Sequence, residues 1–240
     1  MSDDITTRAR ELLDDEGGRA EEFAELAVDL SQQPDLGTTL EAVTAAAQRT
    51  LGGDGGGIFL HERGRLVTAW ATDESAERAE HLQNELNEGP CIDSALEPEF
   101  RISADLCDEP RWASWSRRMV ELGWRSALSA PLLAPGGEPI GSLNLFSPLP
   151  SVFSDDLADL AAVFALHASV AVLNARREEN LNRAIAAQHR VGVAQGIVMA
   201  QFDVDPGRAF ELIRAYSQRA NIKLAAVASY VIERRGLPGA

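Results

Sequence analysis

Residues 127–146 read ALSAPLLAPGGEPIGSLNLF, and this stretch decides the fold of most of the chain. Two short apolar runs, 127–133 and 140–146, flank the turn residues 135–138, which include one proline and two glycines. Apolar runs on either side of such a turn are typical of a β-hairpin. The stretch therefore predicts two antiparallel strands.

An earlier hairpin is predicted by the runs 58–60 and 66–70, which a polar turn separates. Apolar residues at helical spacing predict helices from 20 to a stop at Pro34, and over 36–51, 76–86 and 115–122. The glycine-rich run 52–57 predicts a flexible turn, and 89–111 an irregular region. Helices that enclose hairpin-linked strands predict an α+β fold with an antiparallel sheet.

A long helix is expected to follow, because neither glycine nor proline occurs between Leu157 and Gly192. At alternating spacings of three and four, one line along it comprises Leu166, Val170, Leu173, Arg177, Asn180, Ala184, Ala187 and Val191. The first part of the line is apolar, which predicts a helix that pairs loosely with a second copy. The alternative is a single core helix followed by a linker.

The last part of the chain predicts three helices. The first carries Val191 to Phe202 and includes Gly192 and Gly196, which should let another helix approach closely. Asp205 followed by Pro206 begins the second helix. Asn221 is expected to cap a third, which ends near Gly236.

Charge divides the chain unevenly. Residues 181–240 hold eight Arg or Lys against four acids, a net charge of +4, whereas the whole chain carries −15. Residues 1–180 must therefore carry −19. A basic segment on an acidic body indicates binding to a polyanion, and the alternative is a solvated helical face. Lys223 is the only lysine, an arginine bias that indicates a high-GC, actinobacterial source.

Motifs for catalysis are missing from the sequence. The glycine run lacks the Gly-Lys-Ser/Thr of a phosphate loop, the four histidines lie far apart, and no nucleophile elbow or kinase motif occurs. We therefore expect no enzyme and no metal site. Cys91 and Cys107 fit free thiols in a reducing cytoplasm. With no apolar run near 20 residues and no signal-peptide pattern at the start, we expect a cytoplasmic protein.

Spaced elements in the three C-terminal helices resemble one known family. They are Gly192 to Met199, Ala209 to Arg214, Ser217-Gln218, and Asn221-x-Lys223-Leu224-x-x-Val227-Ala228. Together, over residues 183–236, they resemble the ANTAR domain, a three-helix RNA-binding module of bacterial transcription antiterminators. The resemblance implies a pair of small hairpins in leader RNA as the target, read by a dimer, and a folded hairpin pair that excludes a terminator.

The preceding part resembles the GAF domain of actinobacterial regulators. The similar segments are Ala71-Thr72-Asp73, Gly89-Pro90-Cys91, Pro110-Arg111-Trp112 and Gly141 to Ser147. The implied division is a lead-in over 1–19, a GAF sensory domain over 20–172, a helical linker over 173–182 and the ANTAR domain over 183–236. A small ligand or a partner is implied as the signal for the GAF domain, but no metal or nucleotide motif identifies it.

The ANTAR resemblance also assigns roles to individual residues. It implies that Ala194, Gly196, Ala209 and Ala228 let the three helices pack. The implied RNA-binding residues are Arg190, Gln195, Arg214, Ser217, Asn221 and Lys223. Arg and Lys would contact phosphates, while Asn and Ser could read a loop base. The resemblance thus implies a signal-responsive, homodimeric antitermination regulator. The alternative is a small-molecule sensor whose C-terminal helices only dimerise or bind protein.

Overall fold

The computed structural model describes residues 27–30, 32–62, 65–96, 98–154 and 157–237. Two compact units divide the chain, unit 1 up to Arg176 and unit 2 from Arg177 onward. The lead-in predicted over 1–19 lies outside the described residues.

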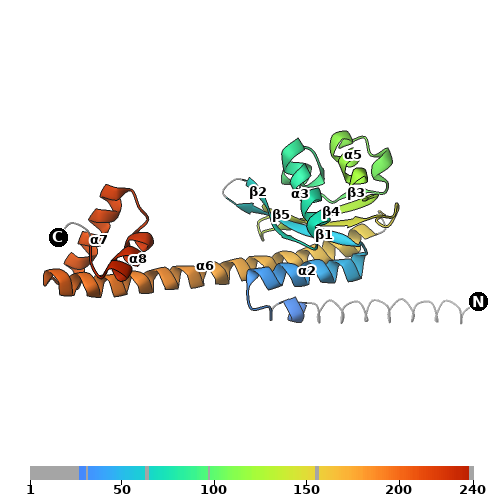
Figure 1. Cartoon of the computed structure of the whole chain (residues 1–240). Coiled ribbons are helices and arrows are strands. Elements are labelled where there is room, and N and C mark those ends of the chain that lie inside the picture. The colour runs from blue at the N-terminus through green and yellow to red at the C-terminus, as the bar shows by residue number, and fades with distance from the viewer. Residues whose placement is uncertain (1–26, 31, 63–64, 97, 155–156, 238–240) are drawn as a thin grey trace, which may run out of the picture. The chain divides into compact units, whose positions relative to one another are not determined.

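Unit 1 is built on a five-stranded antiparallel sheet in the order β2-β1-β5-β4-β3 (Figure 1). The strands are β1 (Gly55–Glu62), β2 (Arg65–Ala71), β3 (Arg101–Ser103), β4 (Ser126–Leu133) and β5 (Pro139–Ser147). Both predicted hairpins are present, as β1 with β2 and β4 with β5. The two hairpins join through β1 and β5, where Gly57 pairs with Asn144.

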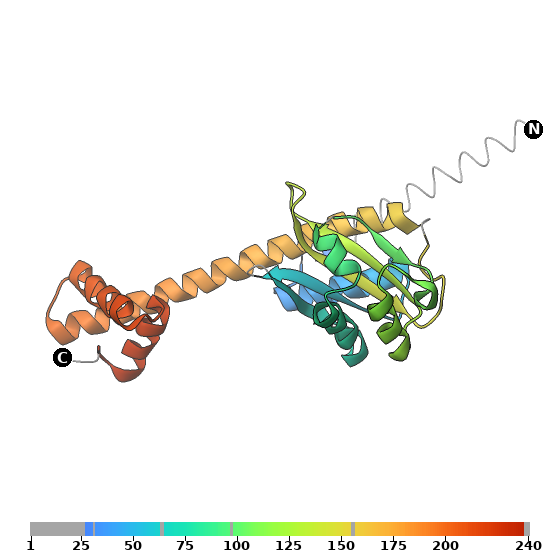
Figure 2. The same cartoon turned by 90° about the horizontal axis from the view of Figure 1, so that it is seen from above.

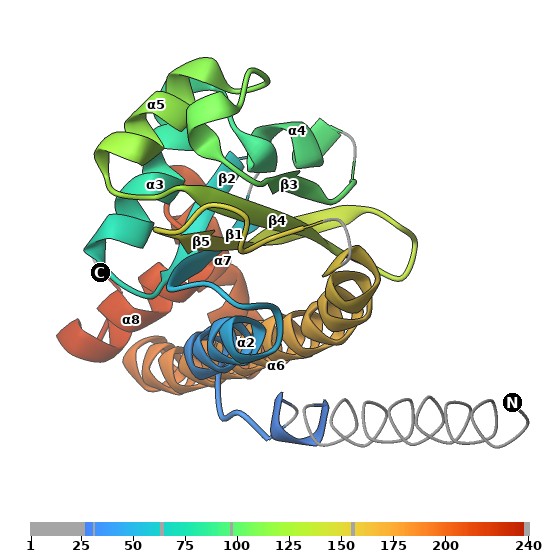
Figure 3. The same cartoon turned by 90° about the vertical axis from the view of Figure 1, so that its right-hand side faces the viewer.

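Helices cover both faces of this sheet (Figure 3). On one face lie α2 (Leu36–Leu51) and the first part of α6 (Ala158–Phe202), with a core that includes Leu40, Leu145 and Phe164. On the other face lie α3 (Glu74–Leu86), α4 (Pro90–Leu96) and α5 (Ala113–Glu121), where Trp115 and Phe146 are fully buried. The α+β class predicted from the sequence is therefore confirmed.

The glycine-rich run is only partly a turn. Gly52 and Gly53 have φ of 89° and 104° and form the turn, but Gly55, Gly56 and Gly57 begin strand β1. A Cβ on Gly55 would lie 2.5 Å from the Trp124 ring. Close packing against the backbone of this strand, rather than flexibility, therefore accounts for the second half of the run.

The region expected to be irregular, 89–111, contains three short elements: α4, β3 and the 3₁₀ turn η1 (Leu106–Asp108). Long-range contacts hold them in place. The Trp112 indole N–H donates to the Asp93 carboxylate at 2.8 Å, and the Asp105 carboxylate accepts two hydrogen bonds from Arg125. Such contacts join residues that lie about twenty positions apart, so periodicity along the chain does not reveal them.

Helix α6 is one continuous helix of 45 residues (Figure 2). The first of the three helices predicted in the last part of the chain is therefore the C-terminal end of α6. The other helices of unit 2 are α7 (Pro206–Ala220) and α8 (Leu224–Arg234). In the first part of α6, Leu166 and Val170 of the predicted line are exposed. After Arg177 the exposed large apolar residues of α6 are Leu181, Ile185, Val193 and Phe202, and the predicted line includes none of them. A straight helix repeats every 3.6 residues rather than every 3.5, so its exposed face drifts away from a strict heptad line.

Candidate functional site

The three helices of unit 2 meet in a small core around three alanines. Ala194, Ala209 and Ala228 are each fully buried, as their predicted packing role requires. Gly196 differs, because it is exposed and a Cβ there would meet nothing within 4 Å. Gly196 therefore takes no part in the core of unit 2, and its packing role stays a prediction.

The connection between α7 and α8 is held by backbone geometry and one side chain. Asn221 ends α7 as its C-cap in the left-handed conformation, with φ of 54°. The Ser217 hydroxyl donates to the Ile222 carbonyl at 2.6 Å, which closes the turn. Asn221 therefore does not cap the third helix as expected. That helix begins after Lys223, whose side chain makes no capping hydrogen bond.

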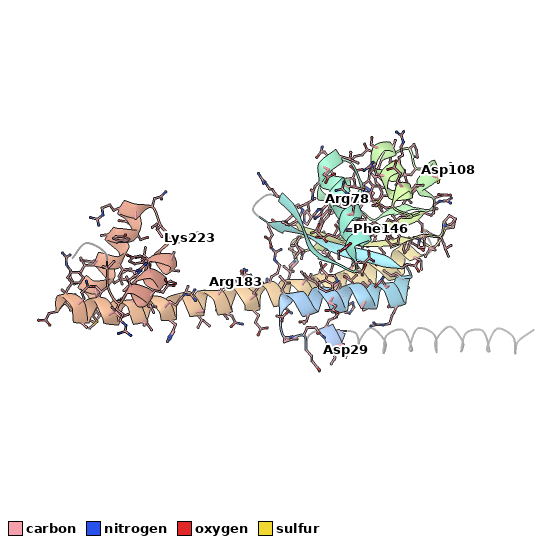
Figure 4. The ribbon with its side chains drawn as sticks, in the orientation of Figure 1. Asp29, Arg78, Asp108, Phe146, Arg183 and Lys223 are labelled. Carbon is pink, nitrogen blue, oxygen red and sulfur yellow. The ribbon has the colours of Figure 1, made fainter. Side chains whose placement is uncertain are left out.

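Cations outnumber acids by eight to four over residues 181–240, which make up most of unit 2. Arg190, Arg214 and Lys223 are exposed and form no ion pair with any residue that the structure describes. Lys223 projects from the start of α8 (Figure 4). Arg208, in contrast, pairs with Glu211 at 2.8 Å, and Arg183 pairs with Glu179. Arg190, Arg214 and Lys223 can therefore take up phosphate without first breaking an internal ion pair.

Four of the predicted binding residues lie near one another along the chain's path. Arg214, Ser217 and Asn221 follow at helical spacing toward the end of α7, and Lys223 comes directly after the turn. Gln195 is elsewhere, since its side-chain amide donates to the Pro206 carbonyl at the start of α7. At about 1.5 Å per residue, the length of α7 places that point roughly 20 Å from Asn221. The structure thus groups Arg214, Ser217, Asn221 and Lys223 and leaves Gln195 outside the group.

A contact between Arg219 and Tyr216 was not predicted from the sequence. The Arg219 guanidinium lies 5.7 Å from the centre of the Tyr216 ring. Their spacing of three residues on a helix is the signal that could have revealed it. Because Tyr216 also packs against the core of unit 2, its ring is held at the module surface next to a cation.

A second feature that the sequence did not reveal is a buried polar cluster in unit 1, between α3, α4 and the sheet. Glu80, Gln83, Cys91 and Asn144 are all 0–1% exposed. The Asn144 amide donates to Glu80 Oε1 at 2.8 Å, and the Cys91 thiol donates to Asn144 Oδ1 at 2.8 Å. Gln83 accepts from the Cys91 backbone N–H at 2.9 Å. These bonds link two helices to strand β5 through polar groups alone.

Burial sets the protonation of this cluster. It raises the pKa of Glu80 to about 8, against the lowering effect of the Asn144 hydrogen bond. Burial and the nearby Glu80 charge raise the pKa of the Cys91 thiol to about 12. At neutral pH both groups therefore hold their protons, and Cys91 lacks the thiolate that a reactive cysteine needs.

Two further observations concern the described residues. Across them, no group of three or more His, Cys, Asp or Glu side chains is arranged to hold a metal ion. No helix in the same part of the chain is both long and apolar enough to cross a membrane.

Family models match both parts of the chain. The GAF domain matches residues 33–173, and the ANTAR domain matches residues 179–232. Domains of these families act as sensors and regulators and are generally without enzymatic activity. No curated protein matches the chain.

Solved structures agree in fold. The GAF domain of a phosphoenolpyruvate-protein phosphotransferase from Acinetobacter superposes with a TM-score of 0.53 at 14% identity, covering 67% of this chain and 96% of that one. The GAF domain of the corresponding Coxiella burnetii protein has a TM-score of 0.52 at 18% identity, covering 65% and 94%. At such identities the likeness shows the fold alone. The first family match spans more than half of the sequence, so the chain belongs to the GAF domain family, and it carries an ANTAR domain in its C-terminal part.

Proposed function

We propose that the chain is a cytoplasmic regulator that binds hairpin RNA in leader transcripts through unit 2 and thereby causes transcription antitermination. Unit 1 would sense a small ligand or a partner and control that binding. The observation that carries the proposal is the set of exposed, unpaired cations on unit 2 in a chain whose net charge is −15. The ANTAR match over residues 179–232 supports RNA as the polyanion.

The contact surface would centre on the end of α7 and the start of α8. Arg214 and Lys223 would bind phosphates, since both are exposed and free of internal ion pairs. Asn221 would reach a loop base, because its left-handed backbone holds the residue at the exposed turn. Ser217 would act mainly by holding this turn, as its hydroxyl proton is committed to Ile222.

Control would run through α6 and a homodimer. The exposed apolar residues of α6 support pairing with a second copy, and the helix is continuous from the sheet of unit 1 into the core of unit 2. A signal bound at unit 1 would shift an equilibrium between arrangements of the paired helices, only one of which presents both RNA-binding modules to a hairpin pair.

The test is binding of the purified full chain to a two-hairpin leader RNA across a salt series. We expect affinity that falls steeply with salt, and Arg214→Ala/Lys223→Ala should weaken it and make the salt slope shallower by about 1 to 2, because two phosphate contacts are lost. The matched control is Arg183→Ala/Arg208→Ala, which removes the same charge from two cations that are already paired. If both double variants lose the same RNA affinity, net charge alone would explain the loss, and a specific RNA-binding surface at Arg214 and Lys223 would be contradicted.

The exposed apolar residues of α6 also favour a second candidate function, a sensor whose C-terminal helices only dimerise or bind protein. Such a protein would self-associate without salt-sensitive RNA binding.

Duplex DNA of the same length as the RNA is added as a competitor in the same binding assay. Because the proposed site needs unpaired bases, the hairpin RNA should bind more tightly than the DNA duplex.

A further inference from the structure

Residues 176–179 of α6 read Arg-Arg-Glu-Glu, and among the residues that the structure describes only the outer two have charged partners. Arg176 donates to the His61 carbonyl at 3.1 Å and lies 4.0 Å from the Glu62 carboxylate. Glu179 pairs with Arg183. The inner residues, Arg177 and Glu178, are exposed and form no ion pair within the described chain. Two opposite charges at adjacent positions of the helix therefore have no ion-pair partner among the described residues.

Next to them lies an uncovered apolar face. Leu181 is 61% exposed and Ile185 is 56% exposed, and both follow Arg177 at spacings of four residues. In the part of α6 that belongs to unit 1, the exposed apolar residues are Val163, Leu166 and Val170. Large apolar side chains that recur at spacings of three and four on a helix are typical of a face that another helix covers.

The free charges flank this face on opposite sides. At about 100° per residue, Asn174, Leu181 and Ile185 fall on nearly one line along α6. Arg177 lies roughly 50° to one side of that line, and Glu178 lies about as far to the other side. The centre of the face therefore carries Leu181 and Ile185 above Asn174, with a cation on one edge and an anion, at almost the same height, on the other.

Such a face is complementary to itself under one symmetry only. In a parallel two-fold pair of helices, the left edge of one helix meets the right edge of the other, so each Arg177 meets a Glu178. In an antiparallel pair centred here, equal edges meet, so Arg177 would face Arg177 and Glu178 would face Glu178. Charged residues beside an apolar seam set partner and orientation in this way.

We propose that a second copy of this chain covers the face, paired parallel and in register along α6, with Arg177 of each copy beside Glu178 of the other. This inference rests on the homodimer in the proposed function and specifies its orientation and register. The pairing also explains why a helix keeps two unsatisfied charges next to exposed leucine and isoleucine. It brings both ANTAR domains to the same end of the pair.

The test exchanges the charges and measures self-association of the full chain by sedimentation equilibrium. Arg177→Glu and Glu178→Arg should each weaken the homodimer on the order of tenfold, because two cross-pairs become repulsive. The double exchange Arg177→Glu/Glu178→Arg should restore it. Mixing the two single variants should give a heterodimer about as tight as the wild-type homodimer. Arg183→Glu, which changes a cation paired within the helix, should leave the association unchanged.

Other outcomes would overturn the inference in recognisable ways. An antiparallel pair predicts single variants no weaker than the wild type and a mixed heterodimer tighter than it. A monomeric wild type, or variants that all associate equally, would mean that something other than a second copy covers this face. Circular dichroism of each variant separates loss of pairing from loss of folding.

A disulfide provides an independent measure of register. In a Cys107→Ser background, Leu181→Cys should oxidise to a covalent dimer, since a parallel in-register pair places residue 181 opposite itself. Failure to cross-link under conditions that oxidise a model dithiol would contradict the register. RNA binding measured on the same proteins keeps the two proposals apart: salt-sensitive binding by a monomeric wild type would end the pairing inference and leave the RNA-binding proposal intact.

Discussion

Glu80 carries a carboxyl group in the protein interior, where Asp and Glu side chains are rare. Its carboxyl group is fully buried on α3 and held by the Asn144 amide, and Gly57 on the neighbouring strand leaves room for it, since a Cβ there would lie 2.9 Å from Oε1. The charged groups around it offer no compensation. Glu77 and His81 of α3 lie near each other at the surface, and Asp93 of α4 accepts from Trp112.

Replacing this carboxyl group should therefore change how the stability of unit 1 depends on pH. The pKa of Glu80 is raised from 4.5 to about 8 in the folded chain, so the folded state keeps a proton that the unfolded state loses. The free energy of unfolding should then fall by about 3 kcal/mol as pH rises from 5 to 8. Glu80→Gln, which keeps the shape but cannot ionise, should remove this fall and be more stable than the wild type at pH 8.

Urea unfolding followed by tryptophan fluorescence measures this effect, because all four tryptophans lie in unit 1. Comparing wild type with Glu80→Gln at each pH cancels contributions from other groups, such as His61, whose pKa is lowered by burial. Parallel stability curves for the two proteins would show that Glu80 does not stay protonated in the folded state.

At the scale of a single element, α6 is notable for two glycines in its interior. Gly192 and Gly196 are exposed, and a Cβ at either would meet nothing within 4 Å. Glycine in a helix interior is less favourable than alanine by about 1 kcal/mol. Gly192→Ala and Gly196→Ala should therefore each stabilise unit 2 by up to about 1 kcal/mol, measured by thermal unfolding followed at the helical circular dichroism band.

The same variants show whether the glycines serve an interface. If RNA affinity or self-association falls while stability rises, the absence of a side chain is needed for close approach of a partner. A variant that loses stability would instead indicate a contact that the isolated helix does not contain.

How far the sequence predicts an element depends on where its stabilising contacts come from. The strands of both hairpins and helices α2 and α7 carry local signals, such as the Asp205-Pro206 start of α7, and were predicted. Helix α5 is capped from a distance, since the Glu88 carboxylate accepts from the Ser114 and Trp115 N–H groups. The polar cluster around Glu80 likewise combines residues from α3, α4 and β5. The helix over 115–122 was predicted from its apolar spacing, but neither its cap from Glu88 nor the polar cluster follows from a local pattern. The RNA-binding residues were predicted from the family resemblance alone. Gln195 belongs to the same motif as the others but lies near the start of α7, away from Arg214 and Lys223.

At the scale of the whole molecule, the continuity of α6 across both units should make regulation sensitive to helical phase. Inserting two residues after Asn182 turns the following part of the helix by roughly 200°, whereas seven residues turn it by nearly two full turns. We expect the two-residue insertion to abolish signal-dependent antitermination of a leader–terminator reporter in cells, and the seven-residue insertion to preserve it. Equal behaviour of both insertions would argue against transmission through a rigid helix.

The position of Lys223 has a practical consequence for chemistry on this protein. It is the only lysine in the sequence, and it stands exposed between α7 and α8. An amine-selective dye or cross-linker therefore has a single side chain to modify, directly at the surface where RNA is expected. The same holds for lysine acetylation, which would neutralise one charge at one defined place.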